Sequence, residues 1–276
     1  MLAAKTGRMT SLKYLIYQMD VEPANPEKNR QKVKQWLEEQ VPKHQPDIIV
    51  LPEMWNTGYA LERLEDVADD NGKETLELLK PLAKKYGVHI IAGSVANKRK
   101  DGIYNSSMVI RKDGELIHEY DKMHLVPMLN EPNFLQGGQS KGAIFELDGV
   151  KMGVVICYDL RFPELMRSIA LQGAEVIHVV AQWPESRRTH WRYLQHARAI
   201  ENECYVISAN SAGICNDTQF AGESLVIEPN GDIAAEGSAN QEETIQVIID
   251  LEKVKEMRKS IPVFADRVPG LYRLDE

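Results

Sequence analysis

The chain reads VVICYDLRFPE at residues 154–164, where an apolar run meets a cysteine, a polar turn and a proline. A short β-branched run is typical of a buried strand, and proline is favoured at the first position of a helix. We therefore expect a strand that ends at Cys157, a short elbow, and a helix that begins at Pro163. A thiol at such an elbow is suitably held for nucleophilic attack, because the backbone N–H groups that follow face the same space. Cysteine is also a common core residue, so its position alone favours a structural role.

Strands and helices alternate on both sides of this stretch. Apolar runs predict strands at residues 13–18, 48–51, 88–95, 176–181, 205–209 and 244–249. Helical spacing and capping residues predict helices after residue 25, before residue 87, and at residues 163–171, 187–203 and 251–259. Asp-Gly or Asn-Gly pairs predict hairpins at residues 113–114, 148–149 and 230–231. An α/β fold with mixed sheets follows, and in the absence of a linker-like segment we expect a single domain over residues 9–276.

Composition and charge narrow the class of protein. The 276 residues are 43% hydrophobic, which allows a substantial core, and the formal net charge of −8 disfavours nucleic acid or an anionic membrane as a partner. No apolar run reaches the roughly 18 residues of a membrane span, and residues 1–8 lack the apolar stretch of a secretory signal. We interpret residues 1–8 as an N-terminal extension or a cloning remnant and expect a cytoplasmic protein. Three cysteines without CxxC spacing argue against a disulfide framework or a zinc ribbon.

Two other polar residues also stand at the ends of apolar strands. Glu53 follows the run at residues 48–51, where a carboxylate is well placed to take a proton from a thiol, although a solvated strand-end carboxylate is an equally good interpretation. Lys122 follows an amphipathic strand, and for a single lysine the commoner explanation is a surface side chain. Neither residue identifies a site by itself.

Taken together, three segments carry a more specific signal. They resemble the signature blocks of the nitrilase, or carbon–nitrogen hydrolase, superfamily: Leu51-Pro52-Glu53, Asp121-Lys122-Met123-His124-Leu125 and Ile156-Cys157-Tyr158-Asp159-Leu160-Arg161-Phe162-Pro163-Glu164. The similarity extends from about residue 12 to residue 272 and includes Gly58-Tyr59, Tyr104-Asn105, Gly137-Gly138 and Asp266-Arg267. The resemblance implies a four-layer αββα sandwich. It also implies a homodimer or larger homo-oligomer, packed through the elements around the cysteine elbow and the C-terminal tail.

The resemblance also implies a role for each matching residue. Cys157 would be the nucleophile, Glu53 the general base and acid, and Lys122 the electrophilic stabiliser. The backbone N–H of Tyr158 would share the oxyanion with Lys122, and Glu131 would position the lysine or the substrate. A solvated loop carboxylate is the alternative for Glu131. The implied reaction hydrolyses a small amide through a Cys157 thioester, and side chains alone carry it, so we expect no metal and no organic cofactor.

The residues around the cysteine narrow the expected substrate. Nitrile-hydrolysing members of the family commonly carry Trp-Glu after the cysteine, whereas this chain has Tyr158-Asp159, which favours amides. The block at residues 181–184 (AQWP) and the loop at residues 122–135 resemble the ω-amidase branch, which acts on 2-oxoglutaramate or similar dicarboxylate monoamides. Such a substrate needs a cation for its free carboxylate, and Arg161 is a candidate, although an arginine that pairs with a neighbouring glutamate is an equal alternative. Trp183 is a candidate wall of the pocket or a core residue.

The sequence by itself also allows other functions. Within the family, the alternatives are another amidase, an N-carbamoyl hydrolase or a nitrilase. A metal hydrolase, a serine hydrolase and a nucleotide enzyme are disfavoured, because the chain has no HExxH, no GxSxG and no correctly spaced phosphate loop. From a different class, the chain could be a non-catalytic scaffold or a thiol redox sensor on the same fold.

Overall fold

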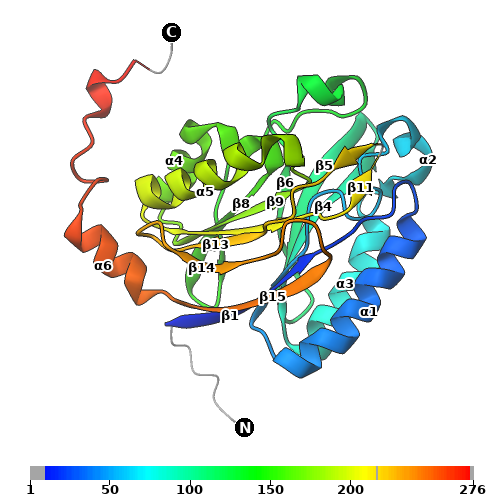
Figure 1. Ribbon diagram of the computed structural model, residues 1–276, viewed down its shortest axis with the longest axis horizontal. Coiled ribbons are helices and arrows are strands. Elements are labelled where there is room, and N and C mark those ends of the chain that lie inside the picture. Colours follow the sequence, from blue (N-terminus) through cyan, green and yellow to red (C-terminus); the bar gives the residue numbers. More distant parts are fainter. Residues whose placement is uncertain (1–9, 216, 274–276) are drawn as a thin grey trace.

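Two β-sheets pack face to face, and helices cover the outer face of each (Figure 1). The computed structural model describes residues 10–215 and 217–273, so the extension predicted at residues 1–8 lies outside the described residues. The larger apolar core contains side chains of both sheets, among them Tyr14 and Val50 from one and Val154 and Val179 from the other. The arrangement is the four-layer αββα sandwich that the resemblance implied.

The first sheet has three parallel strands, β1, β2 and β4, with antiparallel strands at both edges. Its order is β15-β1-β2-β4-β5-β6, and β3 pairs with the far end of β4. Its strands are β1 (Ser11–Gln18), β2 (Ile48–Val50), β3 (Asp69–Asp70), β4 (His89–Arg99), β5 (Gly102–Ile110), β6 (Leu116–Asp121) and β15 (Glu243–Asp250).

The second sheet repeats this plan, with β8, β9 and β10 parallel at its centre. Its order is β14-β13-β10-β9-β8-β7. Its strands are β7 (Phe145–Leu147), β8 (Val150–Ile156), β9 (Val176–Ala181), β10 (Tyr205–Asn210), β13 (Leu225–Ile227) and β14 (Ile233–Glu236). A separate two-stranded ribbon joins β11 (Ile214–Cys215) and β12 (Thr218–Gln219).

Crossover helices form the two outer layers. Helices α1 (Pro26–His44) and α3 (Lys73–Tyr86) lie against the first sheet, where a second apolar cluster fills the contact. Helices α4 (Pro163–Leu171) and α5 (Arg188–Asn202) cover the second sheet. The Asn25 side chain caps α1 by accepting a hydrogen bond from the N–H of Lys28 at 3.2 Å, and Gly87 ends α3 in the left-handed conformation.

The remaining helices are short or peripheral. Helix α2 (Leu64–Val67) has a single turn, whereas α6 (Glu252–Ser260) leads into a tail that extends away from the sandwich (Figure 1). Among the described residues, no helix combines the length and the apolar character needed to cross a membrane.

A buried histidine joins the two sheets. His178 in β9 donates from Nδ1 to the carbonyl of Gly153 at 3.0 Å, and its Nε2 lies 3.2 Å from the hydroxyl of Tyr14 in β1. Burial lowers the pKa of His178 from 6.5 to about 4, although the carbonyl of Gly153 favours the charged ring. The ring is therefore neutral in the folded protein at neutral pH, with Nε2 accepting from Tyr14.

This histidine predicts a loss of stability in mild acid. Below about pH 6.5 this histidine binds a proton in the unfolded chain, whereas in the folded chain it stays neutral until about pH 4. The free energy of unfolding should therefore fall by about 3 kcal/mol from this group as the pH drops from 6.5 to 4. Urea unfolding across this range measures the effect, and His178→Gln should flatten the slope relative to the parent chain. An equal slope in both proteins would contradict the assignment.

Candidate active site

Cys157 lies at the end of β8, where the chain turns sharply into a 3-10 segment, Cys157–Arg161. Its φ angle is +48°, in the left-handed region, which costs a non-glycine residue about 1–2 kcal/mol and requires support from its surroundings. The side chain is buried except for 5% of its surface. The elbow predicted from the sequence is therefore present, with the sulfur at the carboxyl edge of the parallel strands.

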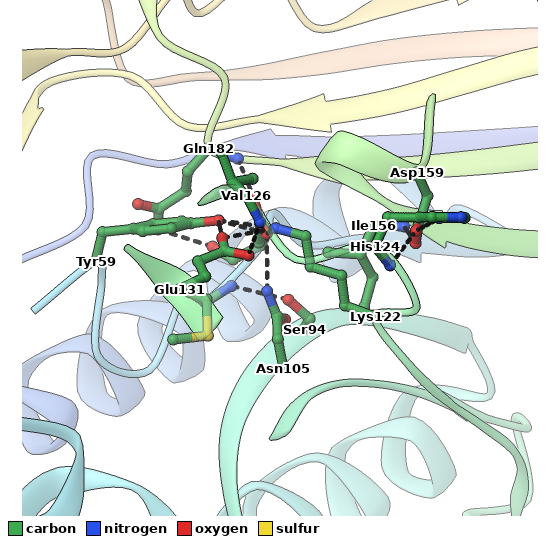
Figure 2. A network of polar contacts seen from close by, with 12 residues as sticks. Tyr59, Ser94, Asn105, Lys122, His124, Val126, Glu131, Ile156, Asp159 and Gln182 are labelled. Atoms are coloured by element: carbon green, nitrogen blue, oxygen red, sulfur yellow. Dashed lines mark hydrogen bonds and ion pairs between the residues drawn. The ribbon is translucent and has the colours of Figure 1, made fainter. Parts of the chain in front are cut away.

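A buried carboxylate holds this elbow in place (Figure 2). Asp159 accepts a hydrogen bond on Oδ2 from the N–H of Ile156 at 3.1 Å. The same oxygen accepts from the hydroxyl of Tyr120 at 2.8 Å. Its Oδ1 lies 3.1 Å from the N–H of His124 and 2.8 Å from the ring Nδ1 of the same residue. Asp159 thus ties the elbow to the segment that carries Lys122. Neither Asp159 nor His124 was assigned a role from the sequence.

Glu53 and Lys122 form a buried ion pair next to Cys157. Lys122 Nζ donates to Glu53 Oε1 at 3.0 Å, and both side chains are fully buried. Glu53 also accepts from Asn105 Nδ2 on Oε1 and from the N–H of Gln182 on Oε2, each at 2.8 Å. The surface-lysine and solvated-carboxylate interpretations are therefore wrong for this pair. Glu53 follows β2 and Lys122 follows β6, and these two strands are not neighbours in the sheet.

Glu131 completes the buried group (Figure 2). It is fully buried, which excludes the solvated-loop alternative, and Lys122 Nζ donates to its Oε1 at 2.8 Å. The N–H of Val126 donates to its Oε2 at 2.8 Å. The hydroxyl of Tyr59 lies 2.7 Å from Glu131 Oε1 and 2.8 Å from Glu53 Oε1. The sequence pattern contained Gly58-Tyr59, but it gave no reason to place a phenol between two carboxyl groups.

Burial and neighbouring charges set the resting protonation of two of these groups. Burial would by itself lower the pKa of Lys122, but its two carboxyl partners, Glu53 first and then Glu131, outweigh it, so the pKa is raised and the ammonium is retained. Burial raises the pKa of Cys157 well above its usual value, and Glu53 adds to this rise through its charge and a hydrogen bond, while Lys122 opposes it. At neutral pH the sulfur is therefore a thiol in contact with Glu53, and attack requires a base.

A cavity of about 210 Å³ opens onto the sulfur. Arg161 lies in its wall with its guanidinium carbon 4.7 Å from the centre of the Trp183 ring, and its guanidinium nitrogens lie 3.4 Å from His190 Nδ1. Among the described residues, no carboxylate forms an ion pair with Arg161. The structure therefore does not support the alternative in which Arg161 pairs with a neighbouring glutamate. The cavity is lined by Val126, Met128, Leu129, Cys157, Tyr158, Arg161, Gln182, Trp183, Pro184, Ser186, Arg187 and Thr218.

Arg187 was not anticipated from the sequence. It is the last residue of a 3-10 turn, Glu185–Arg187, immediately before α5, where the sequence gives no reason to single out one of several charged residues. A second cavity, of about 400 Å³, is lined by Tyr59 and Cys215 among others, and the two cavities share Leu129 and Thr218. In the part of the chain that the structure describes, no group of three or more His, Cys, Asp or Glu is arranged to hold a metal ion.

Solved structures identify the class of fold. A carbon–nitrogen hydrolase from Helicobacter pylori G27 superimposes with a TM-score of 0.90 at 25% identity, over 97% of this chain and 99% of that chain. A member of the nitrilase superfamily, Saccharomyces cerevisiae Nit3, superimposes with a TM-score of 0.85 at 28% identity, over 95% and 98% of the two chains. The fold is thus that of the nitrilase-like hydrolases.

Sequence comparisons then identify the family. Residues 16–259 match the family model described as carbon–nitrogen hydrolase. A protein called hydrolase in agr operon, from Staphylococcus lugdunensis, is 51% identical over 228 residues, which cover 82% of this chain and 97% of that protein. A 2-oxoglutaramate amidase from Bacillus subtilis is 44% identical over 255 residues, or 92% and 97% of the two chains. The chain belongs to the carbon–nitrogen hydrolase family, which confirms the predicted family and class of enzyme.

Proposed function

We propose that this enzyme hydrolyses the amide group of a small dicarboxylate monoamide, such as 2-oxoglutaramate, and releases ammonia. The observation that carries the proposal is the charge of the cavity next to Cys157. Two arginines, Arg161 and Arg187, are among its lining residues, and no aspartate or glutamate of the described residues is. A cavity of this charge favours a substrate with a free carboxylate. The 2-oxoglutaramate amidase of B. subtilis, at 44% identity, supports the same substrate class.

The first half of the reaction acylates the enzyme. Glu53 takes the proton of the Cys157 thiol as the sulfur attacks the amide carbon, and the carbonyl oxygen becomes an oxyanion. The N–H of Tyr158 and the ammonium of Lys122 stabilise this oxyanion. In the resting site Lys122 directs its three N–H groups to Glu53, Tyr59 and Glu131. Protonation of Glu53 weakens the first of these bonds, which frees an N–H as the oxyanion forms.

The second half releases both products. Protonated Glu53 donates its proton to the leaving nitrogen, the carbon–nitrogen bond breaks, and ammonia departs from a thioester on Cys157. Glu53 then removes a proton from a water molecule that attacks the thioester carbon. The carbon–sulfur bond breaks, Glu53 returns its proton to the sulfur, and the carboxylic acid product leaves. Mass spectrometry of the enzyme quenched during turnover should detect the thioester on Cys157. A scaffold or a redox sensor with the same fold would show none.

A comparison of substrates tests the proposed specificity. Ammonia release from 2-oxoglutaramate should exceed that from a short aliphatic amide and a nitrile at equal concentration. Preferred turnover of an N-carbamoyl amino acid or a nitrile would instead assign the chain to one of those branches of the family.

The two arginines give a sharper prediction. Arg161→Met and Arg187→Met should each raise KM for 2-oxoglutaramate by roughly 10- to 100-fold, because each removes a charge-assisted hydrogen bond to the distal carboxylate. Neither change should alter KM for a short aliphatic amide, which lacks that carboxylate. Steady-state kinetics on both substrates measures the difference, and an equal loss on both would show that the arginines only support the fold.

We also propose that the enzyme is a homodimer or a larger homo-oligomer. The tail after α6 carries apolar side chains that are at least half exposed, at Ile261, Val268 and Leu271. Exposed apolar side chains grouped on one segment favour a protein partner, and a second copy would bury them. Light scattering of the purified protein should give at least twice the mass of one chain, and truncation before Val268 should weaken the assembly.

A further inference from the structure

The hydroxyl of Tyr59 has one proton but contacts two carboxyl oxygens. It lies 2.8 Å from Glu53 Oε1 and 2.7 Å from Glu131 Oε1, both of which are ordinary lengths for an O–H···O hydrogen bond (Figure 2). A phenol donates a single hydrogen bond, so it makes only one of these contacts as donor. In the other contact, two oxygen lone pairs would face each other unless the carboxyl group carried a proton. The geometry therefore requires a second proton.

The lysine cannot supply this proton. Its three N–H groups are already directed to Glu53 Oε1 at 3.0 Å, Glu131 Oε1 at 2.8 Å and the Tyr59 oxygen at 3.2 Å. Tyr59 also keeps its own proton, because burial raises the pKa of its hydroxyl well above the usual value. The additional proton therefore resides on one of the two carboxyl groups.

The hydrogen-bond donors around each carboxyl group indicate which one is neutral. Apart from Tyr59 and Lys122, Glu53 receives the Asn105 amide and the N–H of Gln182, and it contacts the Cys157 thiol. Glu131 receives only the N–H of Val126 besides the same two groups, among the described residues. Donors stabilise the ionised form, so Glu53 is the better solvated anion and Glu131 is the neutral acid.

Charge balance gives the same result. The three ionisable side chains Glu53, Lys122 and Glu131 are fully buried. Two carboxylates with one ammonium would leave a net negative charge in the interior, which is costly, whereas two carboxyl groups that share a site commonly hold one proton between them. With a neutral Glu131, the ammonium and the Glu53 carboxylate form a balanced pair.

We propose that Tyr59 is a positioning residue that links a protonated Glu131 to an ionised Glu53. In this arrangement the Glu131 acid donates to the Tyr59 oxygen, and the Tyr59 hydroxyl donates to Glu53. The consequence is that Glu53 is held ionised, as a base must be, without an additional buried charge. The catalytic part of this inference rests on the proposed function of Glu53, whereas the protonation of Glu131 does not.

Infrared spectroscopy tests the protonation without a substrate. At pH 7 the folded enzyme should show the carbonyl-stretch band of a protonated carboxyl group, and this band should shift in D2O. The band should disappear in Glu131→Gln, while circular dichroism confirms that the variant is folded. Loss of carboxylate bands in its place would show that Glu131 is ionised and would overturn the proposal. This result stands even if none of the tested amides is a substrate, in which case the proposed function alone fails.

The pH profile tests the positioning role of Tyr59. Tyr59→Phe removes a donor to the Glu53 carboxylate, so the acid limb of kcat/KM should move to higher pH by about one unit. Tyr205→Phe is a matched control, because Tyr205 is also buried and its hydroxyl donates to the carbonyl of Asp250, outside the site. The control should leave the limb unchanged. A uniform loss of activity in Tyr59→Phe with no shift of the limb would show a merely structural role.

Discussion

Cys157→Ala is expected to abolish ammonia release from 2-oxoglutaramate, with a loss of roughly 10⁴-fold or more in kcat. Alanine removes the thiol that lies against Glu53, so no thioester can form and the remaining groups can only polarise the amide. The fold should survive, because the change removes one small buried atom. A coupled ammonia assay measures kcat, and thermal unfolding checks that the variant is folded.

The other two cysteines provide the controls for this experiment. Cys204 is fully buried beyond the end of α5, and burial raises the pKa of its thiol to about 12. Cys215 lines the second cavity, which does not include Cys157 among its lining residues. Cys204→Ala and Cys215→Ala should therefore retain turnover. A comparable loss in all three variants would mean that Cys157 has no special role.

Local signals explain why much of the fold could be predicted. The helix at residues 163–171 and the strand at residues 176–181 have the predicted bounds, because a proline at the first helical position and a glycine after the last turn are read directly from the chain. The division of the strands between two sheets could not be predicted. It depends on which strands pair across long separations, as β1 does with β15, and such pairing has no local signature.

The candidate site was accessible from the sequence only in part. Glu53, Lys122 and Cys157 stand out because each follows an apolar strand and matches a family block, and the structure brings the three together. The general rule that lysines lie at the surface fails for Lys122, because two buried carboxyl groups offset the free-energy cost of removing its ammonium from water. Tyr59 could not be assigned, because its function depends on two partners that are remote in the sequence.

Lys122→Met should have the second large effect, on stability as well as on activity. It removes the stabilising cation of the oxyanion, so turnover should fall below detection. It also leaves the buried Glu53 carboxylate without its counter-charge, and breaking a buried pair in this way typically costs about 3–5 kcal/mol of the free energy of unfolding. Urea unfolding measures the loss, and an unchanged free energy of unfolding would contradict the buried ion pair.

A double variant separates the two effects of this change. Lys122→Met with Glu53→Gln removes both charges, so no unpaired ion remains and part of the lost stability should return, while activity stays absent. If Glu131 is already neutral, as the geometry around Tyr59 requires, the double variant leaves no charge among the three side chains and recovery should be substantial. If Glu131 is ionised, a buried carboxylate remains without a cation and the double variant should stay as unstable as Lys122→Met. The free energy of unfolding of this inactive double variant therefore reports whether Glu131 is ionised or neutral.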